Sequence, residues 1–376
     1  MRVMVVVDVL SGGAAGGAER IAALLGRELM TRGVEVATIL PMNEHTEGAL
    51  AALGAQGFHV QSHPSMLPVD VPRRAADVWR LARFIRAFRP DVLSMHTGCP
   101  WIRSKDVLAA RLAGAPCVVT VHGGEQLDSA VYQRRTRRAA RFLRRIVVHG
   151  SMVKRSLVSA GVPAGGIDVV PCGVPAPHER PSRERARALL GVPSDAFVVS
   201  TLGRLIPRKG IGDLIAAFGL LPADGGRSLL FVGGDGPERE RLERMVDGSV
   251  AGRVRFLGTL ADPAALYAAS DLFVLPARHE AFGLVYVEAA HFGVTSIGGS
   301  EDGTADAIEH EVSGLLVKPG DVHSLVLAIE RLRDDTELRN RLSAAAARQA
   351  ARRFSVAAMT DGYWRALGLP LARASA

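Results

Sequence analysis

The segment Asp271-Leu-Phe-Val-Leu-Pro-Ala-Arg-His-Glu280-Ala-Phe-Gly283-Leu-Val-Tyr-Val-Glu288 predicts one strand–loop–helix unit. Its first six residues are a short apolar run stopped by proline, which is typical of a buried strand. A helical pattern begins at about Gly283, so Glu280 is expected at the helix mouth and Glu288 about a turn and a half inside. A helix mouth offers free backbone N–H groups and a positive dipole end, which favour a phosphate. A carboxylate beside it suits hydroxyl groups, so the segment predicts a pocket for a ligand such as a nucleotide sugar.

Apolar runs alternate with amphipathic helical patterns along nearly the whole chain. Continuous Val, Ile and Leu runs flanked by helices indicate parallel sheets covered on both faces. The 376 residues favour two domains, and the segment Pro171–Pro181, with four prolines in eleven residues, is typical of a linker. We therefore expect an α/β fold of two Rossmann-like, doubly wound domains that face a cleft lined by loops at the strand C-terminal ends.

The predicted elements follow from these patterns. The strands are expected at Arg2–Val9, Glu35–Leu40, Val92–His96, Cys117–His122, Ile146–His149, Ile167–Val170, Phe197–Gly203, Ser228–Gly233, Val254–Leu257, Leu272–Pro276, Thr295–Gly298 and Gly314–Val317. Helices are expected at Glu19–Arg32, Val78–Phe88, Ser129–Arg145, Gly283–Phe292, Asp321–Arg353 and Ser355–Leu367.

The net charge of +8 comes from 46 basic and 38 acidic residues. Only four of the basic residues are lysine, and the other 42 are arginine. This arginine bias indicates a compositional habit rather than a function. The densest cluster lies on one predicted helix and comprises Arg134, Arg135, Arg137, Arg138, Arg141, Arg144 and Arg145. It can be a solvated helix face, a contact with an anionic membrane, or a nucleic-acid contact. Aromatic content of 5% leaves little material for base stacking, so no nucleic-acid partner is expected.

The composition also indicates the cellular compartment and whether a metal or cofactor is expected. No apolar run approaches ~18 residues, so no membrane-spanning helix is predicted. The segment Met1–Asp8 matches a buried first strand better than a signal peptide, because Asp8 and the following glycines interrupt it. The three cysteines, Cys99, Cys117 and Cys172, have no pairing pattern, and no DxD, HExxH or Cys/His cluster occurs in a suitable position. A cytoplasmic protein without a required metal or cofactor is expected.

Two cations follow another predicted strand in Thr201-Leu-Gly203-Arg204-Leu-Ile-Pro-Arg-Lys209-Gly210. A proline-stiffened loop places Arg204 and Lys209 before the next helix, where a guanidinium fork and an ammonium point charge can neutralise a diphosphate. The alternative is a solvated basic turn.

Glycines end several predicted strands. Phe231-Val-Gly-Gly234-Asp-Gly236-Pro and Phe256-Leu257-Gly258 leave room for a ring or a backbone and can form walls of a nucleotide pocket. Asp302-Gly-Thr-Ala-Asp306 follows another strand, and its short helix can add N–H groups to the same site.

The first domain carries two further signals. The loop Ser11-Gly-Gly-Ala-Ala-Gly16-Gly17-Ala-Glu19 allows close approach of a ligand to the backbone, or is a plain flexible turn. Val119-Thr-Val-His122-Gly-Gly-Glu125 ends a buried strand with a histidine, which opens onto the cleft or caps the loop.

These residues together resemble glycosyltransferase family 4, a group of retaining, nucleotide-sugar-dependent enzymes with a GT-B fold. The resemblance covers nearly the whole chain and is most specific over residues 197–317. Its carriers are the glycine loop at 12–17, His122, Gly203-Arg204, Lys209-Gly210, Gly234-Asp-Gly236-Pro, Phe256-Leu257-Gly258, the Glu280/Glu288 pair and Gly314-Leu-Leu-Val317.

The resemblance implies a role for each matching position. Glu288 should hold the ribose hydroxyls, Arg204 and Lys209 the diphosphate, and Glu280 the donor-sugar hydroxyls. His122 should lie close to the transferred sugar. The backbone near the donor should comprise Gly16, Gly17, Gly203, Gly234, Gly236, Leu257, Phe282, Gly283 and Leu284. The implied domains are an acceptor-binding domain at 1–175, a nucleotide-sugar-binding domain at 176–353, and a segment at 354–376 whose helix crosses back onto the first domain.

Two departures from the family pattern concern the sugar end of the pocket. The usual Gly-Gly-x-x-Glu is Gly303-Thr-Ala-Asp306 here, with a shorter acid, and the usual proline before the strand at Thr295 is missing. These departures therefore bear on which sugar the donor carries more than on the type of reaction.

The expected activity is transfer of a hexosyl or N-acetylhexosaminyl group, with retention, from a nucleotide diphosphate sugar. A UDP-sugar is the donor expected first. The acceptor is expected to be a hydroxyl of a small-molecule, natural-product or sugar acceptor, attacked on the face of the leaving diphosphate. A covalent route through Glu280 stays open. Around the acceptor, Glu125 and Asp128 can meet a cationic molecule such as an aminocyclitol.

Other functions stay open as well. The arginine cluster instead favours a membrane-surface glycosyltransferase acting on an anionic lipid or polysaccharide precursor. A nucleotide-sugar epimerase or a phosphorylase would use the same two-domain plan, and a non-catalytic basic nucleic-acid or membrane binder is the alternative of another class. The sequence carries no signal for an oligomeric state.

Overall fold

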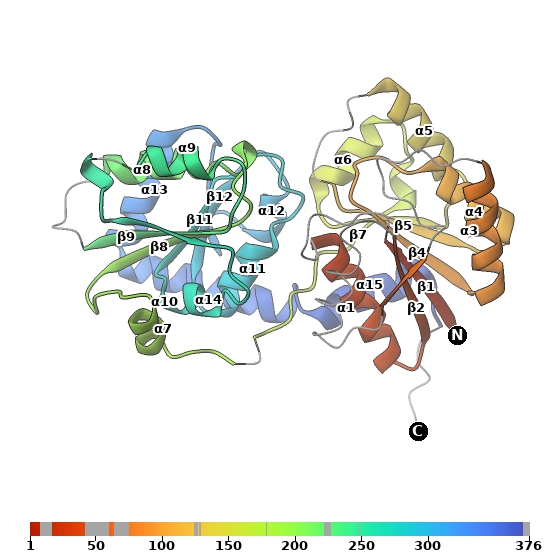
Figure 1. Cartoon of the computed structure of the whole chain (residues 1–376), viewed down its shortest axis with the longest axis horizontal. Coiled ribbons are helices and arrows are strands. Elements are labelled where there is room, and N and C mark those ends of the chain that lie inside the picture. Colours follow the sequence, from red (N-terminus) through yellow and green to blue (C-terminus); the bar gives the residue numbers. More distant parts are fainter. Residues whose placement is uncertain are drawn as a thin grey trace. The chain divides into compact units, whose positions relative to one another are not determined.

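The computed structural model describes residues 1–7, 17–41, 60–63, 75–123, 127, 129–177, 179–221, 227–246 and 248–370. The chain divides into two compact units (Figure 1). Unit 1 contains Met1–Gly173 together with the segment that begins at Val356, and unit 2 contains Val174–Ser355. The chain passes between the units inside the proline-rich segment and again at the last helix.

Unit 1 is built on a seven-stranded parallel sheet in the order β3-β2-β1-β4-β5-β6-β7. Its strands are β1 (Arg2–Val7), β2 (Glu35–Pro41), β3 (Val60–His63), β4 (Val92–Thr97), β5 (Cys117–Val121), β6 (Arg145–Val148) and β7 (Ile167–Val169). All residues of β4 and β5 are buried, as expected for strands covered on both faces.

Helices cover both faces of this sheet. The helices α1 (Gly17–Thr31) and α15 (Val356–Leu367) pack together against one face. On the other face α3 (Ala75–Phe88), α4 (Ser104–Ala113) and α5 (Ala130–Ala140) pack side by side (Figure 1). The remaining elements are α6 (Ser151–Ser159) and the 3₁₀ turn η1 (Ala164–Gly166).

Unit 2 repeats the same strand order in a six-stranded parallel sheet, β10-β9-β8-β11-β12-β13. The strands are β8 (Phe197–Leu202), β9 (Ser228–Gly233), β10 (Val254–Gly258), β11 (Leu272–Leu275), β12 (Thr295–Gly299) and β13 (Gly314–Val317). In both sheets the first strand of the unit lies in the middle, and the chain reverses its direction of winding there. Such a reversal opens a ligand crevice at the carboxyl ends of the two central strands.

The helices of unit 2 also lie in two layers (Figure 1). One layer contains α8 (Ile211–Leu220), α9 (Arg239–Arg244) and α13 (Val322–Asp334). The other contains α7 (Arg183–Leu189), α10 (Ala264–Ala269), α11 (Leu284–His291) and α14 (Thr336–Arg352). The shorter elements are α12 (Thr304–Ala307) and the 3₁₀ turns η2 (Pro207–Lys209) and η3 (Gly248–Val250).

The predicted α/β fold of two Rossmann-like domains is confirmed, with three local corrections. The strand β3 was not predicted, because Val60-Gln-Ser-His63 is not an apolar run. The predicted helix at 321–353 is two helices, because the Asp335 side chain accepts a hydrogen bond from the Leu338 N–H at 2.8 Å and starts a new helix.

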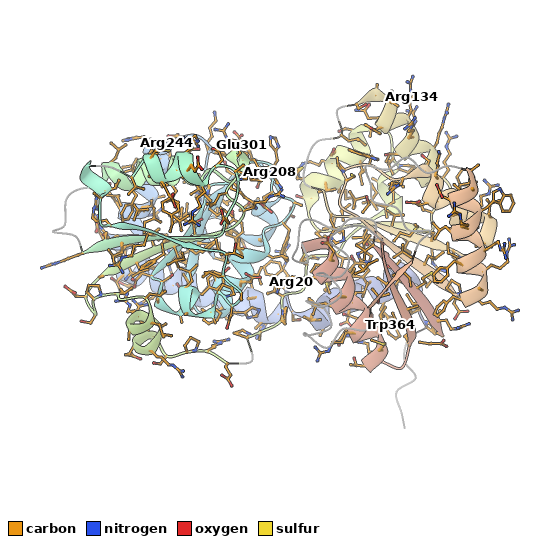
Figure 2. All side chains as sticks on the ribbon, in the orientation of Figure 1. Arg20, Arg134, Arg208, Arg244, Glu301 and Trp364 are labelled. Atoms are coloured by element: carbon orange, nitrogen blue, oxygen red, sulfur yellow. The ribbon has the colours of Figure 1, made fainter. Side chains whose placement is uncertain are left out.

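The third correction concerns the arginine cluster, which does not lie on a single helix. The helix α5 ends at Ala140, and Arg145 lies on β6, where its guanidinium pairs with the Asp168 carboxylate. Arg134 projects outward from α5 (Figure 2). The cluster is therefore a basic surface formed by α5 and the turn that follows it. Within the described residues, no helix is long and apolar enough to cross a membrane.

Candidate active site

The central strands of unit 2, β8 and β11, place two opposite charges together beyond their carboxyl ends. Lys209 lies in the loop after β8, and Glu280 lies in the loop after β11. The Lys209 Nζ and a Glu280 carboxylate oxygen lie 2.5 Å apart, and only 14% and 16% of the two side chains are exposed. The pair therefore stands at the reversal point of the sheet, where a doubly wound fold binds its ligand.

The two loops are joined by their backbones as well. The Arg278 N–H donates to the Arg208 carbonyl at 2.7 Å, and the Arg208 guanidinium donates to the His279 carbonyl at 3.3 Å. Arg204 is exposed at the start of the first loop, and no ion pair is found for it among the described residues. Lys209 is thus neutralised by Glu280, whereas the Arg204 side chain is exposed to a ligand.

A third segment, after β12, holds the backbone of Glu280. The Asp302 carboxylate accepts hydrogen bonds from the Glu280 N–H at 2.7 Å and from the Thr304 N–H at 2.8 Å. The Gly303 N–H donates to the Glu280 carbonyl at 2.8 Å. Asp302 is buried, and this burial raises the pKa of its carboxyl, while the hydrogen bonds act in the opposite direction. Asp302 was expected to add N–H groups to the site. Its side chain, as the anchor of Glu280, was not predicted.

The backbone of the loop is strained next to Glu280. His279 has a φ of 59°, a left-handed conformation that is rare for a side-chain-bearing residue. Such a conformation persists only where surrounding contacts hold it, and it is common at functional sites. The contacts of Arg208 and Asp302 on either side supply that restraint here.

The helix α11 begins directly after this loop. Gly283 has a φ of 87° and caps the helix, and a Cβ at this position would lie 2.3 Å from the Tyr286 ring. Only glycine fits this turn, which turns the first amides of α11 toward the loop. The Phe282 side chain is buried against the Phe354 ring, at 5.3 Å between centroids, so Phe282 can contribute only its backbone.

Glu288 lies half-buried on α11, as the pattern predicted. The Tyr267 hydroxyl donates a hydrogen bond to its carboxylate at 2.8 Å, and the Tyr267 ring is fully buried on α10. The Tyr267 hydroxyl therefore orients the Glu288 carboxylate, and the sequence patterns did not indicate Tyr267 as a site residue.

The glycines at the ends of β8 and β9 bring two backbones into contact. A Cβ on Gly234, whose φ is 112°, would lie 1.9 Å from the Gly203 carbonyl oxygen. A Cβ on Gly236 would lie 2.5 Å from the Leu205 carbonyl oxygen. Leu257 at the end of β10 is partly buried and packs its side chain against the core of unit 2.

His122 follows β5 in unit 1, where both of its ring nitrogens lie close to other histidines. Its Nε2 lies 2.9 Å from His96 Nδ1, and its Nδ1 lies 3.1 Å from His149 Nε2. Burial lowers the pKa of His122 well below its ordinary value, and the two neighbouring histidines lower it further. The histidine was predicted at this strand end, but its two partners were not.

Several predicted site residues lie outside the described residues: Gly16, Glu125 and Asp128. Gly17 is the first residue of α1. In the described part of the chain, no group of three or more His, Cys, Asp or Glu side chains could hold a metal ion.

Two doubly wound units in one chain, with a cation–carboxylate pair at the reversal point of the second, match the two-domain plan expected of a GT-B glycosyltransferase. Family models agree with this class: "Glycosyltransferase Family 4" matches residues 15–176 and "Glycosyl transferases group 1" matches residues 182–349. The chain belongs to the glycosyltransferases of this family. The predicted enzyme class, a glycosyl-transferring enzyme, is thereby confirmed.

Curated relatives include glycosyltransferases with different substrates in their names. The lipopolysaccharide core biosynthesis glycosyltransferase LpsD of Rhizobium meliloti is 40% identical over 49% of this chain and 53% of its own length. The chain thus spans about half the length of this relative. The 2-deoxystreptamine N-acetyl-D-glucosaminyltransferase of Streptomyces fradiae is 31% identical over 73% of this chain and 69% of the relative. The GDP-mannose-dependent alpha-(1-6)-phosphatidylinositol monomannoside mannosyltransferase of Mycobacterium tuberculosis is 30% identical over 83% and 84%.

Solved structures agree on the fold. Anabaena Alr3699/HepE in complex with UDP superposes with a TM-score of 0.84 and 23% identity, over 98% of this chain and 100% of that one.

Proposed function

We propose that the protein transfers a hexosyl or N-acetylhexosaminyl group, with retention, from a nucleotide diphosphate sugar to an acceptor hydroxyl. The Lys209–Glu280 pair at the reversal point of the unit 2 sheet carries the proposal. A partly buried pair of opposite charges can separate toward two parts of one ligand, an anionic diphosphate and a hydroxylated sugar. Partial burial makes the exchange sensitive to ligand charge, because each partner left alone would be costly.

Donor binding is proposed to exchange the partners of this pair. The diphosphate takes Lys209, together with Arg204 and the first amides of α11. Glu280 then accepts hydrogen bonds from hydroxyls of the sugar, and Glu288, held by Tyr267, accepts them from the ribose. The cations and amides stabilise the negative charge that builds on the diphosphate as the glycosidic bond breaks.

The proposed reaction is same-face attack. The acceptor oxygen forms a bond to the anomeric carbon, the bond from that carbon to the diphosphate oxygen breaks, and the acceptor proton passes to the leaving diphosphate. The described residues supply charge stabilisation and positioning for this step. A covalent route through Glu280 would need that carboxylate to give up Lys209 and attack the anomeric carbon from the opposite face.

The donor is proposed to be UDP-linked. The support is the resemblance of the site pattern and the UDP complex of the structural neighbour, whereas the mannosyltransferase relative is named for GDP-mannose. A thermal-shift panel of UDP, GDP, ADP and dTDP, followed by hydrolysis assays with the corresponding sugar nucleotides, tests the choice. A shift with UDP alone supports it, a shift with GDP alone corrects it, and binding of none would refute the enzymatic proposal.

The acceptor is proposed to be a small-molecule, natural-product or sugar hydroxyl, and the enzyme is proposed to be cytoplasmic. The aminocyclitol named for the Streptomyces fradiae relative supports an acceptor of this kind. The odd number of cysteines, which have no pairing pattern in the sequence, supports a reducing compartment. The test is transfer onto a panel of aminocyclitols and oligosaccharides in the absence of lipid.

A second candidate is an acceptor presented on an anionic membrane, and one observation favours it. The outer helices α3, α4 and α5 of unit 1 contain only two acids, Asp77 and Asp106, and both are buried. Trp79 on α3 and Phe142 after α5 are more than half exposed among the arginines of these helices. Basic surfaces with exposed aromatic residues are typical of membrane contact.

Activity with and without anionic vesicles separates the two candidates. A small-molecule acceptor predicts little change on adding vesicles or salt. A strong dependence on anionic vesicles, lost when Arg134, Arg135 and Arg138 are replaced with glutamine, would favour the membrane-presented acceptor.

A further inference from the structure

Three histidines form a row across the carboxyl ends of three adjacent strands in unit 1. His96 is on β4, His122 follows β5 and His149 follows β6. His96 Nδ1 lies 2.9 Å from His122 Nε2, and His122 Nδ1 lies 3.1 Å from His149 Nε2. At the two ends, Ser94 Oγ lies 3.0 Å from His96 Nε2, and the Val170 carbonyl lies 2.9 Å from His149 Nδ1.

The Val170 carbonyl gives this row a direction. A carbonyl oxygen can only accept, so His149 must carry its proton on Nδ1. In a neutral row, the His149 Nε2 then accepts from His122 Nδ1–H, and by the same logic the His122 Nε2 accepts from His96 Nδ1–H. The row ends with the Ser94 hydroxyl donating to His96 Nε2. Only one set of tautomers satisfies every contact.

The surroundings keep the row neutral. His96 and His149 are buried, and burial lowers the pKa of His96 to about 3 and of His149 to about 4. The charge of His149 would also lower the pKa of His96, and the charges of His149 and His96 would lower the pKa of His122, because neighbouring imidazolium ions repel. At neutral pH no ring carries an extra proton that could reverse the direction.

The last helix of the chain lies on the row. The Tyr363 ring on α15 stacks on His96 at 5.9 Å between centroids, and its hydroxyl lies 3.0 Å from Thr120 Oγ1. Gly362 on the same helix lies against Val170, where an added Cβ would come within 2.6 Å of the valine side chain. The helix therefore fixes both the first ring and the carbonyl that orients the row.

We propose that His96 and His149 are positioning residues that hold His122 in the Nδ1–H tautomer, so that His122 meets a substrate only as a hydrogen-bond acceptor at Nε2. The inference rests on the proposed function, in which His122 lies near the transferred sugar. A substrate hydroxyl would donate to His122 Nε2 in exchange for the bond from His96. The row thus selects a hydroxyl or N–H at this position of the substrate and disfavours an ether oxygen or a carboxylate.

The tautomer is measured directly on the full-length protein labelled with ¹⁵N-histidine. A long-range ¹H–¹⁵N correlation spectrum distinguishes protonated from bare ring nitrogens, and His→Gln variants assign the signals. The expected result is a protonated Nδ1 and a bare Nε2 on His122, His96 and His149 at neutral pH. A protonated Nε2 on His122 would overturn the proposal, whatever the outcome of any activity assay.

The matched pair His149→Gln and His149→Leu tests the positioning role. The glutamine side-chain carbonyl can accept from His122 Nδ1–H, whereas leucine cannot. We expect His149→Leu to lower kcat about tenfold and to mix the His122 tautomers, and His149→Gln to restore both. UDP affinity should be unchanged in both variants, because the proposed nucleotide contacts of Glu288, Arg204 and Lys209 lie in unit 2, away from His149 in the sequence.

The two failures are distinguishable. If the wild-type protein transfers no sugar, the proposed function fails while the spectrum still decides the tautomer. If His149→Leu folds, loses the tautomer preference and keeps the wild-type kcat, the positioning role is refuted. If His149→Leu does not fold, the wild-type spectrum and the variant His96→Asn, which keeps a donor toward His122, decide the same question.

Discussion

Replacing Asp302 with alanine should separate sugar transfer from nucleotide binding. The Asp302 carboxylate accepts the N–H groups of Glu280 and Thr304 at 2.7 and 2.8 Å and is almost fully buried. Alanine would leave both donors without this acceptor and would free the loop that carries Glu280. The Glu288–Tyr267 contact lies on α11 and α10, outside that loop. The substitution should therefore affect the sugar end of the site.

The magnitude follows from the two hydrogen bonds. Each bond to a charged acceptor contributes about 1.5–3 kcal/mol. The two bonds together contribute about 3–6 kcal/mol. If about half of this energy serves to hold Glu280 in its reactive position, the transition state loses about 1.5–3 kcal/mol, a decrease in kcat of about 10- to 160-fold. Asp302→Asn keeps one acceptor oxygen in the same place, and we expect a smaller decrease of about fivefold.

Steady-state kinetics with the donor, combined with calorimetric titration of UDP, measures both effects. The prediction is a large decrease in kcat for Asp302→Ala and an affinity for UDP within about threefold of wild type. Thermal melting controls for general loss of structure. An equal loss of UDP affinity, or an unchanged kcat in a folded variant, would refute the assignment of Asp302 to the positioning of Glu280.

Three further predictions concern the charges of the two units. Lys209→Ala should lower kcat/KM for the donor about 100-fold or more, measured by donor hydrolysis; a loss below threefold would exclude a diphosphate contact. Glu288→Gln should weaken UDP binding about tenfold. Tyr267→Phe should weaken UDP binding less, because this variant keeps the Glu288 carboxylate and removes the hydrogen bond that orients it. Equal binding of UDP by Glu288→Gln and wild type in calorimetry would contradict the role of Glu288 in binding the ribose. The pKa values of His96 and His149, about 3 and 4, lie below the unfolded value near 6.5. Below pH 6.5 the unfolded state therefore binds more protons than the folded state. The folded state is thus most stable above pH 6.5 and loses stability as the pH falls. The loss should reach about 2 kcal/mol per histidine at pH 5, measured by urea unfolding, and a free energy of unfolding that is flat between pH 8 and pH 5 would contradict the buried, neutral row.

The parallel sheets could be predicted from sequence because their strands are buried on both faces. A strand such as β11, Leu272-Phe-Val-Leu275, is apolar throughout, and such a run is visible without a partner. The strand β3 lacks such a run, because its sequence is Val60-Gln-Ser-His63, and its backbone pairs with β2 in parallel.

The end of α5 shows why an arginine-rich pattern is a poor guide to a helix boundary. Arginine has a high helix propensity, so the cluster predicted a helix that continued to Arg145. The apolar run Ile146-Val-Val148 belongs to β6, and Arg145 lies on the same strand, where its backbone pairs with β5 at Val118. Its guanidinium pairs with Asp168 on β7, a partner 23 positions later that the local sequence does not indicate.

The chemistry of the donor site was visible in the sequence, but its supporting contacts were not. The Glu280 and Glu288 spacing and the Lys209 loop are local patterns, and parallel-sheet topology places them at one edge. Asp302 and Tyr267 act by hydrogen bonds to residues about twenty positions away, and no periodicity marks such a partner.

The histidine row lies between these two cases. His96, His122 and His149 each stand at or directly after the end of an apolar strand, in Ser94-Met-His-Thr97, Thr120-Val-His-Gly123 and Val147-Val-His-Gly150. The strands β4, β5 and β6 are neighbours in a parallel sheet, so residues at their ends must meet at one edge. This rule would have predicted the cluster once the strand order was assumed. The direction of the row could not be predicted in the same way, because it depends on the Val170 carbonyl on the next strand edge and on the packing of α15 against it. Topology therefore places the imidazole rings, and a single backbone acceptor decides that His122 accepts hydrogen bonds at Nε2 and donates at Nδ1.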